Sequence, residues 1–97
     1  MSAKRFVDCV IIITGSSAGI GRQTALEFAR EGASIVIHGQ NRERLNETER
    51  LLNNEGIAPK RILIVIGQLE KEEVPKQILE QTIERFGRID VLVILLF

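Results

Sequence analysis

The chain has 97 residues, of which 44% are hydrophobic, and 13 basic residues balance 13 acidic ones. This length allows one small domain with a modest core, and the charge balance argues against nucleic acids and anionic membrane surfaces as partners. The single cysteine, Cys9, excludes an intrachain disulfide framework and a thiolate metal cluster, and we expect it to be a buried strand residue in a reducing compartment.

The first predicted strand and helix cover the N-terminal third of the chain. Residues 9–14, CVIIIT, are rich in β-branched side chains and lack polar alternation, which is typical of a strand buried on both faces. After a turn, residues at helical spacing predict a helix that ends at Gly32 and buries one stripe of side chains. The stripe consists of Ile20, Thr24, Ala25, Phe28 and Ala29.

Residues 34–38 and 61–66 predict the second and third strands. Between them, a stripe of three residues at helical spacing indicates a helix, and this helix ends near Gly56. The stripe consists of Leu45, Thr48 and Leu52.

Residues 90–96 predict a fourth strand, and a third helix precedes it. Pro75 is tolerated in the first turn of this helix, and Gly87 ends it. Its inner face is expected to be wide and to contain Val74, Ile78, Leu79, Thr82, Ile83 and Phe86. The order βαβαβαβ predicts an α/β fold with a parallel sheet and helices on both faces, because crossovers through helices are right-handed in ~98% of cases.

The turn TGSSAGIG joins the first strand to the first helix. At the carboxyl end of a parallel strand, a starting helix directs unpaired N–H groups and a positive dipole end into a crevice. Gly15 would allow the bend, Gly19 the close approach of an anion, and Gly21 the packing of helix on strand. Ser16 and Ser17 offer hydroxyl donors. The pattern predicts a phosphate site, and a structural turn without ligand is the alternative.

The turn resembles the Thr-Gly-x-x-x-Gly-x-Gly fingerprint of the short-chain dehydrogenase/reductase family, and FGRIDVLV at 86–93 is similar to the segment that introduces the family's fourth strand. The resemblance covers nearly the whole chain but only the N-terminal part of a family domain. It implies a truncated Rossmann-type fold, with residues 1–97 as a single partial dinucleotide-binding domain. It also implies hydride transfer between a nicotinamide cofactor and a carbonyl or alcohol. The resemblance assigns Gly15, Ser17, Gly19, Ile20 and Gly21 to the pyrophosphate and the adenosine ribose, and Ser16 is added to the cofactor site for its hydroxyl donor.

The end of the second strand decides between NAD and NADP, because a carboxylate there bonds the ribose 2′-hydroxyl and repels a 2′-phosphate. Gly39 stands where NAD-preferring members of the family carry Asp, and Arg42 and Arg44 follow it. NADP is therefore favoured over NAD. Against this, Ala18 and Gln40 replace the family's NADP-type arginines, and the two basic residues also suit a solvated helix surface.

The adenosine is expected at the ends of the second and third strands. Gln40 and Asn41 are assigned to it, although Asn41 also suits a helix start. Gln68 and then Leu69 stand where the family has an Asp that bonds the adenine amino group, and the glutamine carbonyl can still accept that bond. His38 is interpreted as a packed structural residue rather than a ligand.

The groups that exchange a proton during hydride transfer are missing from the sequence. The family uses a tyrosine, a lysine four residues later and a serine, and this sequence has no tyrosine. No other catalytic grouping or metal-ligand spacing replaces them. A P-loop is excluded because Arg22 and Gln23 follow Gly21. We expect no catalytic residue and no metal site.

After Val93 the sequence reads ILLF, whereas the family continues into Asn-Asn-Ala-Gly. An alternative transcript, a frameshift or an incomplete gene model would each produce this ending. The apolar stretch is far shorter than the ~20 residues that cross a membrane, and no signal peptide follows Lys4 and Arg5, so we expect a cytoplasmic protein. The last strand would form an exposed apolar edge, which predicts self-association.

Three interpretations of function remain open. The chain is the cofactor-binding half of an NAD(P)-dependent oxidoreductase, or a non-enzymatic dinucleotide-binding or interaction module, or a non-functional truncated isoform. The substrate is not indicated by any residue of the sequence.

Overall fold

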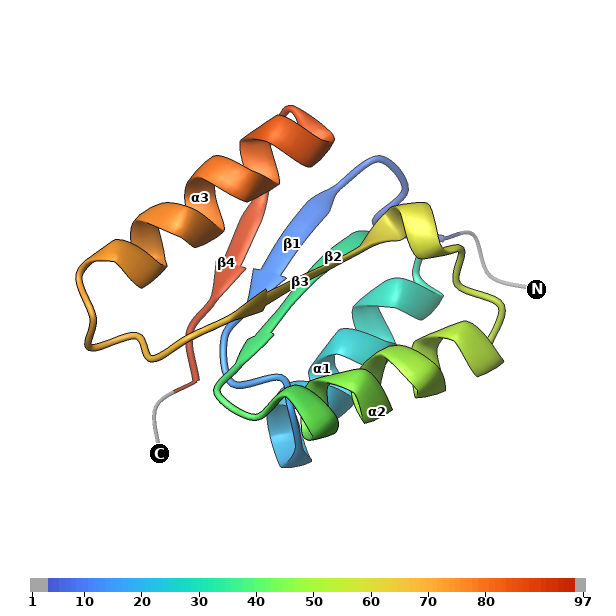
Figure 1. Cartoon of the computed structure of the whole chain (residues 1–97). Helices are drawn as coiled ribbons and strands as arrows, with labels where there is room; N and C mark the ends of the chain where they lie inside the picture. Colours follow the sequence, from blue (N-terminus) through green and yellow to red (C-terminus); the bar gives the residue numbers. More distant parts are fainter. Residues whose placement is uncertain (1–3, 96–97) are drawn as a thin grey trace.

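The computed structural model describes residues 4–95, in which strands alternate with helices along the chain (Figure 1). The order is the predicted one, with a short 3-10 helix added before the third strand. The elements are β1 (Val10–Ile13), α1 (Gly19–Arg30), β2 (Ser34–Gly39), α2 (Arg42–Asn54), η1 (Pro59–Arg61), β3 (Ile62–Ile66), α3 (Glu73–Phe86) and β4 (Val91–Val93). Within the described range, no helix combines the length and the apolar character needed to cross a lipid bilayer.

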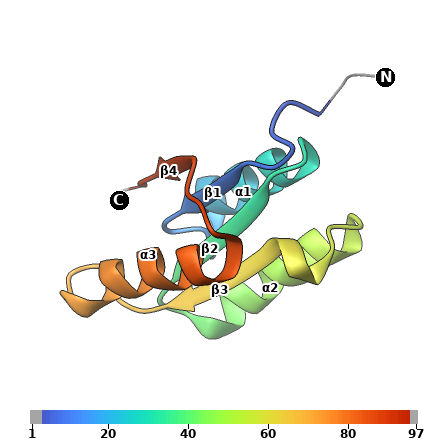
Figure 2. The same cartoon turned by 90° about the horizontal axis from the view of Figure 1, so that it is seen from above.

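The four strands form one parallel sheet in the order β3-β2-β1-β4. Figures 1 and 2 show α1 and α2 on one face of the sheet and α3 on the other. The predicted α/β fold with helices on both faces is therefore confirmed. From β3 the chain crosses to the far side of β1, so the strand order reverses beside β1. Ligands of open parallel sheets bind at the carboxyl ends of the strands next to such a reversal.

The side chains of β1 divide the core into two clusters. Ile11 and Ile13 pack with residues of α1 and α2, whereas Val10 and Ile12 pack with residues of α3. The three isoleucines are fully buried, as the β-branched run predicts, and burying each such side chain contributes about 1.5–3 kcal/mol. Because β1 is held from both faces, the position of the turn that follows it is fixed.

The buried stripe of α1 differs from the prediction at its first turn. Ile20 is 62% exposed, and Leu26 is buried instead. Gly19 is exposed as well, so the start of α1 lies at the rim of the molecule and its packing begins at Gly21. The predicted burial of Ile20 is therefore wrong.

The inner face of α3 is narrower than predicted. Val74, Ile78 and Thr82 are buried, but Leu79 and Ile83 are 45% and 49% exposed. Among the described helices α3 lies alone on its face of the sheet, so it contacts the sheet along one stripe and no neighbouring helix covers its flank. A wide inner face needs a second helix beside it.

The last strand is shorter than the predicted strand 90–96. It covers Val91–Val93, and Leu92 is 50% exposed, so its predicted burial is wrong. Residues 96 and 97 lie outside the described residues. Within the described part of the chain, β4 pairs with β1 alone, and it therefore forms the expected edge of the sheet. Cys9 precedes β1 and is half-buried, which also corrects the prediction of a buried strand residue.

Asp90 fixes the start of β4 against β1. The Val10 N–H donates to Asp90 Oδ2 at 2.7 Å, and the Asp90 N–H donates to the Val10 carbonyl at 2.9 Å. Arg88 Nη2 also donates to Asp90 Oδ1, at 2.7 Å. The Arg88 guanidinium and the Val10 N–H hold the pKa of Asp90 below its usual value. The residue types of FGRIDVLV thus have a structural use, which is to set the register of the edge strand.

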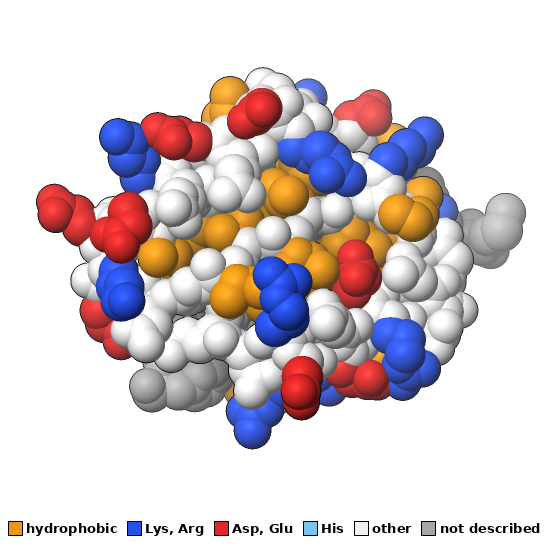
Figure 3. Space-filling model, viewed as in Figure 1, with side chains coloured by type: hydrophobic (Ala, Val, Ile, Leu, Met, Phe, Trp, Pro, Cys, Tyr) orange, Lys and Arg blue, Asp and Glu red, His pale blue; other side chains and the backbone are white. Residues whose placement is uncertain are grey.

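The opposite edge of the sheet is β3. Figure 3 shows apolar side chains gathered in a band over β3, between α3 and α2, with charged side chains on either side. The partly buried residues of β3 that pack on the two core clusters are Leu63, Ile64 and Ile66. Of the two edge strands in the described sheet, β4 is the one that borders the reversal of strand order.

Candidate functional site

The turn between β1 and α1 has a backbone that favours glycine. Gly15 has φ +65° and Gly19 has φ +58°, a region that residues with a Cβ rarely adopt. At Gly21 an added Cβ would lie 2.1 Å from the Gly15 carbonyl oxygen, which is closer than any real contact. The predicted bend at Gly15 is confirmed, and the close packing at Gly21 is confirmed with the turn itself as its partner.

The N-terminus of α1 carries no side-chain cap. Ala18 is its N-cap residue and makes no side-chain hydrogen bond, and the first turn has no acidic residue. By contrast, the Asn41 side chain caps α2 by accepting from the Arg44 N–H at 2.9 Å, and both α2 and α3 have a glutamate in the first turn. The N–H groups at the start of α1 are therefore available to an anion.

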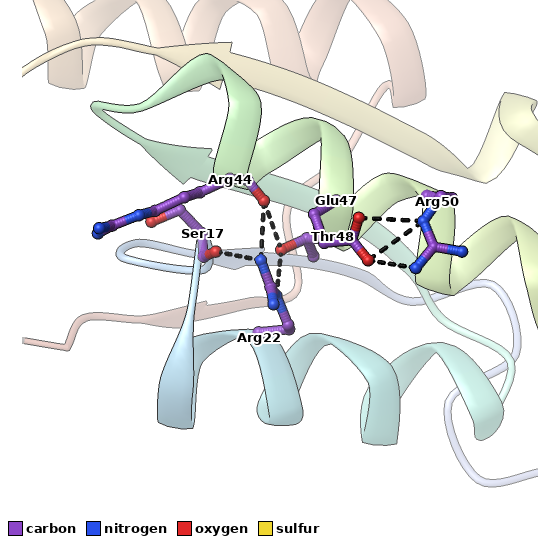
Figure 4. A network of polar contacts seen from close by, with 6 residues as sticks. All are labelled: Ser17, Arg22, Arg44, Glu47, Thr48 and Arg50. Carbon is purple, nitrogen blue, oxygen red and sulfur yellow. Dashed lines mark hydrogen bonds and ion pairs between the residues drawn. The ribbon is translucent and has the colours of Figure 1, made fainter.

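The carbonyl groups of the same turn are held by side chains. Arg22 Nη2 donates to the Ser17 carbonyl at 2.6 Å and to the Arg44 carbonyl at 3.0 Å, and Arg22 Nε donates to Thr48 Oγ1 at 2.8 Å. The Thr48 hydroxyl donates to the Ser16 carbonyl at 2.9 Å. Figure 4 shows the Arg22 guanidinium between the turn and α2, with the Arg44 side chain extending beside Ser17.

This network orients the peptide groups of the turn. A trans peptide directs its N–H opposite to its C=O. The Ser16 carbonyl is bonded by Thr48 and the Ser17 carbonyl by Arg22, so the Ser17 N–H is directed away from Thr48 and the Ala18 N–H away from the Arg22 guanidinium. Sequence reasoning missed this role of Arg22 and assigned Thr48 to the core only. The feature of the sequence that indicates the network is a threonine, Thr48, at a buried position of an otherwise polar helix.

Ser16 does not offer its hydroxyl to a ligand. Its side chain is fully buried, its hydroxyl donates to the Ile13 carbonyl at 2.9 Å, and its Oγ accepts from the His38 N–H at 2.8 Å. These bonds join the end of β1 to the end of β2. The role as a ligand donor predicted for Ser16 is replaced by a structural one.

A cleft of about 600 Å³ opens at the carboxyl ends of β1 and β2. Its lining residues are Gly15, Ser17, His38, Gly39, Gln40, Asn41, Arg44, Leu69, Glu70 and Leu95. Six of the predicted site residues are thus brought together. Of the others, Gly19 and Gly21 belong to the adjoining helix start, and Ile20, Arg42 and Gln68 are exposed outside the lining. Arg44, not Arg42, is the basic residue of the cleft.

The end of β2 has no room for a side chain. A Cβ at Gly39 would lie 2.9 Å from Ser17 Cβ and 3.1 Å from Ser17 Oγ. An acidic residue at this position would therefore displace Ser17 from its place in the turn between β1 and α1. Arg44 and Glu70 are the two charged residues of the lining, and they come from different segments, α2 and the loop after β3.

His38 lies at the floor of the cleft and is 3% exposed. Its Nε2 is 2.8 Å from the Gly67 carbonyl oxygen, and the Gly15 N–H donates to its Nδ1 at 3.4 Å. Burial lowers the pKa of this imidazole, and the bond to the Gly67 carbonyl offsets part of that effect. Within residues 4–95, no cluster of three or more His, Cys, Asp or Glu side chains is arranged to hold a metal ion.

A protein-family model described as short chain dehydrogenase matches residues 9–94. The (2S)-[(R)-hydroxy(phenyl)methyl]succinyl-CoA dehydrogenase subunit BbsD of Thauera aromatica is 38% identical over 84 residues, which are 87% of this chain and 33% of that protein. The 11-beta-hydroxysteroid dehydrogenase A of Sesamum indicum is 36% identical over 84 residues, 87% of this chain and 24% of that protein. The chain spans about a third or less of the length of these relatives.

Solved structures of dehydrogenases and reductases are also similar to this chain. A short-chain dehydrogenase/reductase of unknown function from Caenorhabditis elegans, crystallised with cofactor, is 44% identical with a TM-score of 0.88, over 90% of this chain and 32% of that one. A glucose dehydrogenase of the same organism in the apo form is 42% identical with a TM-score of 0.89, over 91% and 37% of the two chains. The C-domain of a bacterial malonyl-CoA reductase with NADP is 28% identical with a TM-score of 0.86, over 92% and 14%.

Replacing Thr48 by valine removes the hydroxyl between Ser16 and Arg22 while keeping most of the side chain. The buried carbonyl and the Arg22 Nε lose this partner, so we expect the free energy of unfolding to fall by about 1–3 kcal/mol, measured by chemical denaturation. Thr82→Val is the matched control, because Thr82 is equally buried but its hydroxyl bonds only the Ile78 carbonyl of its own helix. Equal losses in both variants would contradict the network.

Proposed function

Because the chain belongs to the short-chain dehydrogenase family, we propose that it binds a nicotinamide dinucleotide across the turn between β1 and α1 and the cleft beside it. The main support for the proposal is that the N-terminus of α1 has no side-chain cap and no carboxylate in its first turn. A diphosphate fits there, since Gly19 has open space around its Cβ position and a helix N-terminus stabilises negative charge.

The adenosine half of the dinucleotide occupies the cleft in this proposal. Gln40 and Asn41 contact the ribose, and Leu69 packs on the adenine, since all three line the cleft. NADP is favoured over NAD, because no side chain fits at Gly39 without moving the phosphate turn and Arg44 supplies a cation beside it. The malonyl-CoA reductase domain that resembles this chain was solved with NADP.

The chain contributes the cofactor-binding part of a hydride-transfer activity and not its proton-transfer groups. The support is the sequence, which contains no tyrosine. When bound, the nicotinamide supplies the hydride. This chain's residues position the diphosphate and the adenosine, and we expect purified chain to bind dinucleotide without reducing carbonyl compounds. A reducing, cytoplasmic compartment is consistent with its single cysteine.

The phosphate site is tested with a Gly19→Asp variant in calorimetric titrations with NADP⁺ and NAD⁺. Nothing lies within 4 Å of the Cβ position of Gly19, and aspartate is among the few residues with a Cβ that visit its positive φ, so the substitution strains the turn less than most others would while a negative charge enters the anion site. We expect the wild-type chain to bind and the variant to lose binding of both ligands. Undiminished binding by the variant, or none by the wild type, contradicts the proposal.

Arg44→Gln tests the preference for NADP. The variant is expected to lose about tenfold in NADP⁺ affinity, which corresponds to one charge-assisted hydrogen bond, and to keep its NAD⁺ affinity. Arg42→Gln is the control, since Arg42 is exposed and lies outside the cleft. If Arg42→Gln has the larger effect, the assignment of the 2′-phosphate site is wrong.

We also propose that the chain self-associates through β4, with a second copy as the partner. On its side away from β1, β4 has no paired strand among the described residues, so its backbone groups on that side can pair with another strand. Leu92 and Ile94 are 50% and 55% exposed and, with Leu79 of α3, they line an apolar groove without charged residues. Apolar exposure next to an open edge favours pairing with another strand.

Leu92→Lys should reduce self-association, because it places a charge on the exposed edge without disturbing the core. Sedimentation velocity over a range of concentrations measures the effect. Ile20→Lys is the control, as Ile20 is equally apolar and 62% exposed but lies on α1. A wild-type chain that stays monomeric at every concentration, or a Leu92→Lys chain that associates as the wild type does, contradicts this role of β4.

A further inference from the structure

We infer that His38 is a positioning residue for the dinucleotide. Its neutral imidazole connects Gly15, the first glycine of the turn between β1 and α1, to the end of β3, and this connection makes binding sensitive to acid. The inference rests on the proposed function and deepens it. His38 itself is expected to act through Gly15, since it is almost fully buried and its two ring nitrogens are directed to backbone groups.

The imidazole connects three segments at the carboxyl edge of the sheet. His38 belongs to β2, Gly15 is the first glycine of the turn after β1, and Gly67 follows β3. Neighbouring backbone bonds strengthen this connection, because the Ser16 N–H donates to the His38 carbonyl at 2.8 Å and the Gly67 N–H donates to the Gly39 carbonyl at 3.1 Å. The ring thus closes a chain of contacts across the floor of the cleft.

The two partners of the ring determine its proton count. A backbone N–H can only donate and a carbonyl can only accept, so the Gly15 N–H needs a bare Nδ1 and the Gly67 carbonyl needs a proton on Nε2. The neutral Nε2–H tautomer satisfies both bonds. A protonated ring would direct a second N–H against the Gly15 N–H, which breaks that bond and loosens the turn.

The charged side chains near the ring do not change its need to be neutral. Arg44 from α2 and Glu70 from the loop after β3 line the same cleft and have opposite charges. The turn after β1 contributes Gly15 and Ser17 to the lining, and the segment after β4 contributes Leu95, none of which titrates. Burial disfavours the imidazolium and lowers the pKa of His38 below 6.5.

The lowered pKa of His38 determines how the stability of the chain changes with pH. The unfolded chain takes up a proton on His38 near pH 6.5 and the folded chain does so only at lower pH, so stability falls as pH falls between the two values. If the dinucleotide binds the neutral form alone, its affinity falls by about tenfold for each pH unit below the folded pKa. Four carboxylates have pKa values below their ordinary values and so take up protons well below pH 6.5, where the window begins; they are Glu31, Glu47, Glu55 and Asp90.

The experiment measures NADP⁺ affinity by calorimetry between about pH 8 and about pH 5, a range that spans the ordinary pKa of histidine. The wild type is compared with His38→Gln, which keeps a donor and an acceptor but does not titrate, and with His38→Leu, which has neither. The ratio of wild-type to variant affinity at each pH removes the titration of the ligand's 2′-phosphate, whose second pKa is about 6.

We expect His38→Gln to bind nearly as the wild type does at the alkaline end and to lack its additional loss of affinity in acid, and His38→Leu to bind more weakly at every pH. Parallel profiles for the wild type and His38→Gln would overturn the inference. A ligand-free readout separates it from the proposed function: in NMR spectra of the wild type, the Gly15 amide and the His38 ring nitrogens should titrate together. Separate titrations overturn the role of His38, whereas absence of NADP⁺ binding at every pH overturns the proposed function.

Discussion

The structure depends on the backbone of one turn, between β1 and α1, whose carbonyls are bonded by side chains while the N–H groups at the start of α1 have no side-chain cap. A buried carbonyl without a partner costs about 1–3 kcal/mol, so a turn shaped only by glycines would be unstable in this orientation. Arg22 and Thr48 satisfy the carbonyls of Ser16 and Ser17. The glycines make the conformation possible, and the polar network with α2 makes it stable.

The same network links the turn between β1 and α1 to the rest of the cleft. Arg22 also bonds the Arg44 carbonyl, so the start of α2 is held at a fixed position beside the turn. His38 connects the turn to the segment after β3 from the opposite side. The ends of three strands and the start of α2 are therefore joined by hydrogen bonds. A chain that spans about a third of its relatives' length therefore holds the residues around this cleft in one connected arrangement.

The sequence predicts those features that depend on local chemistry. The sequence predicts Gly15 and Gly21 because backbone sterics alone require a small residue there. It predicts the parallel sheet because short apolar runs rich in β-branched residues are typical of strands buried on both faces. Features that depend on neighbours were predicted less well. Ile20 and Ile83 follow a helical stripe, yet each is exposed because no second element of the described part of the chain covers it. The contacts of Arg22 become visible only once α1 and α2 are placed side by side.

We propose that bare main chain at the start of α1 receives the diphosphate, and an NMR titration of the amide groups with NADP⁺ shows where the ligand binds. We expect the largest shifts within residues 15–21, led by Ser17, Ala18 and Gly19, while the amides at the start of α3, where Glu73 repels anions, stay unchanged. Saturable binding of NADP⁺ that leaves the amides of residues 15–21 unmoved would show that the diphosphate binds elsewhere.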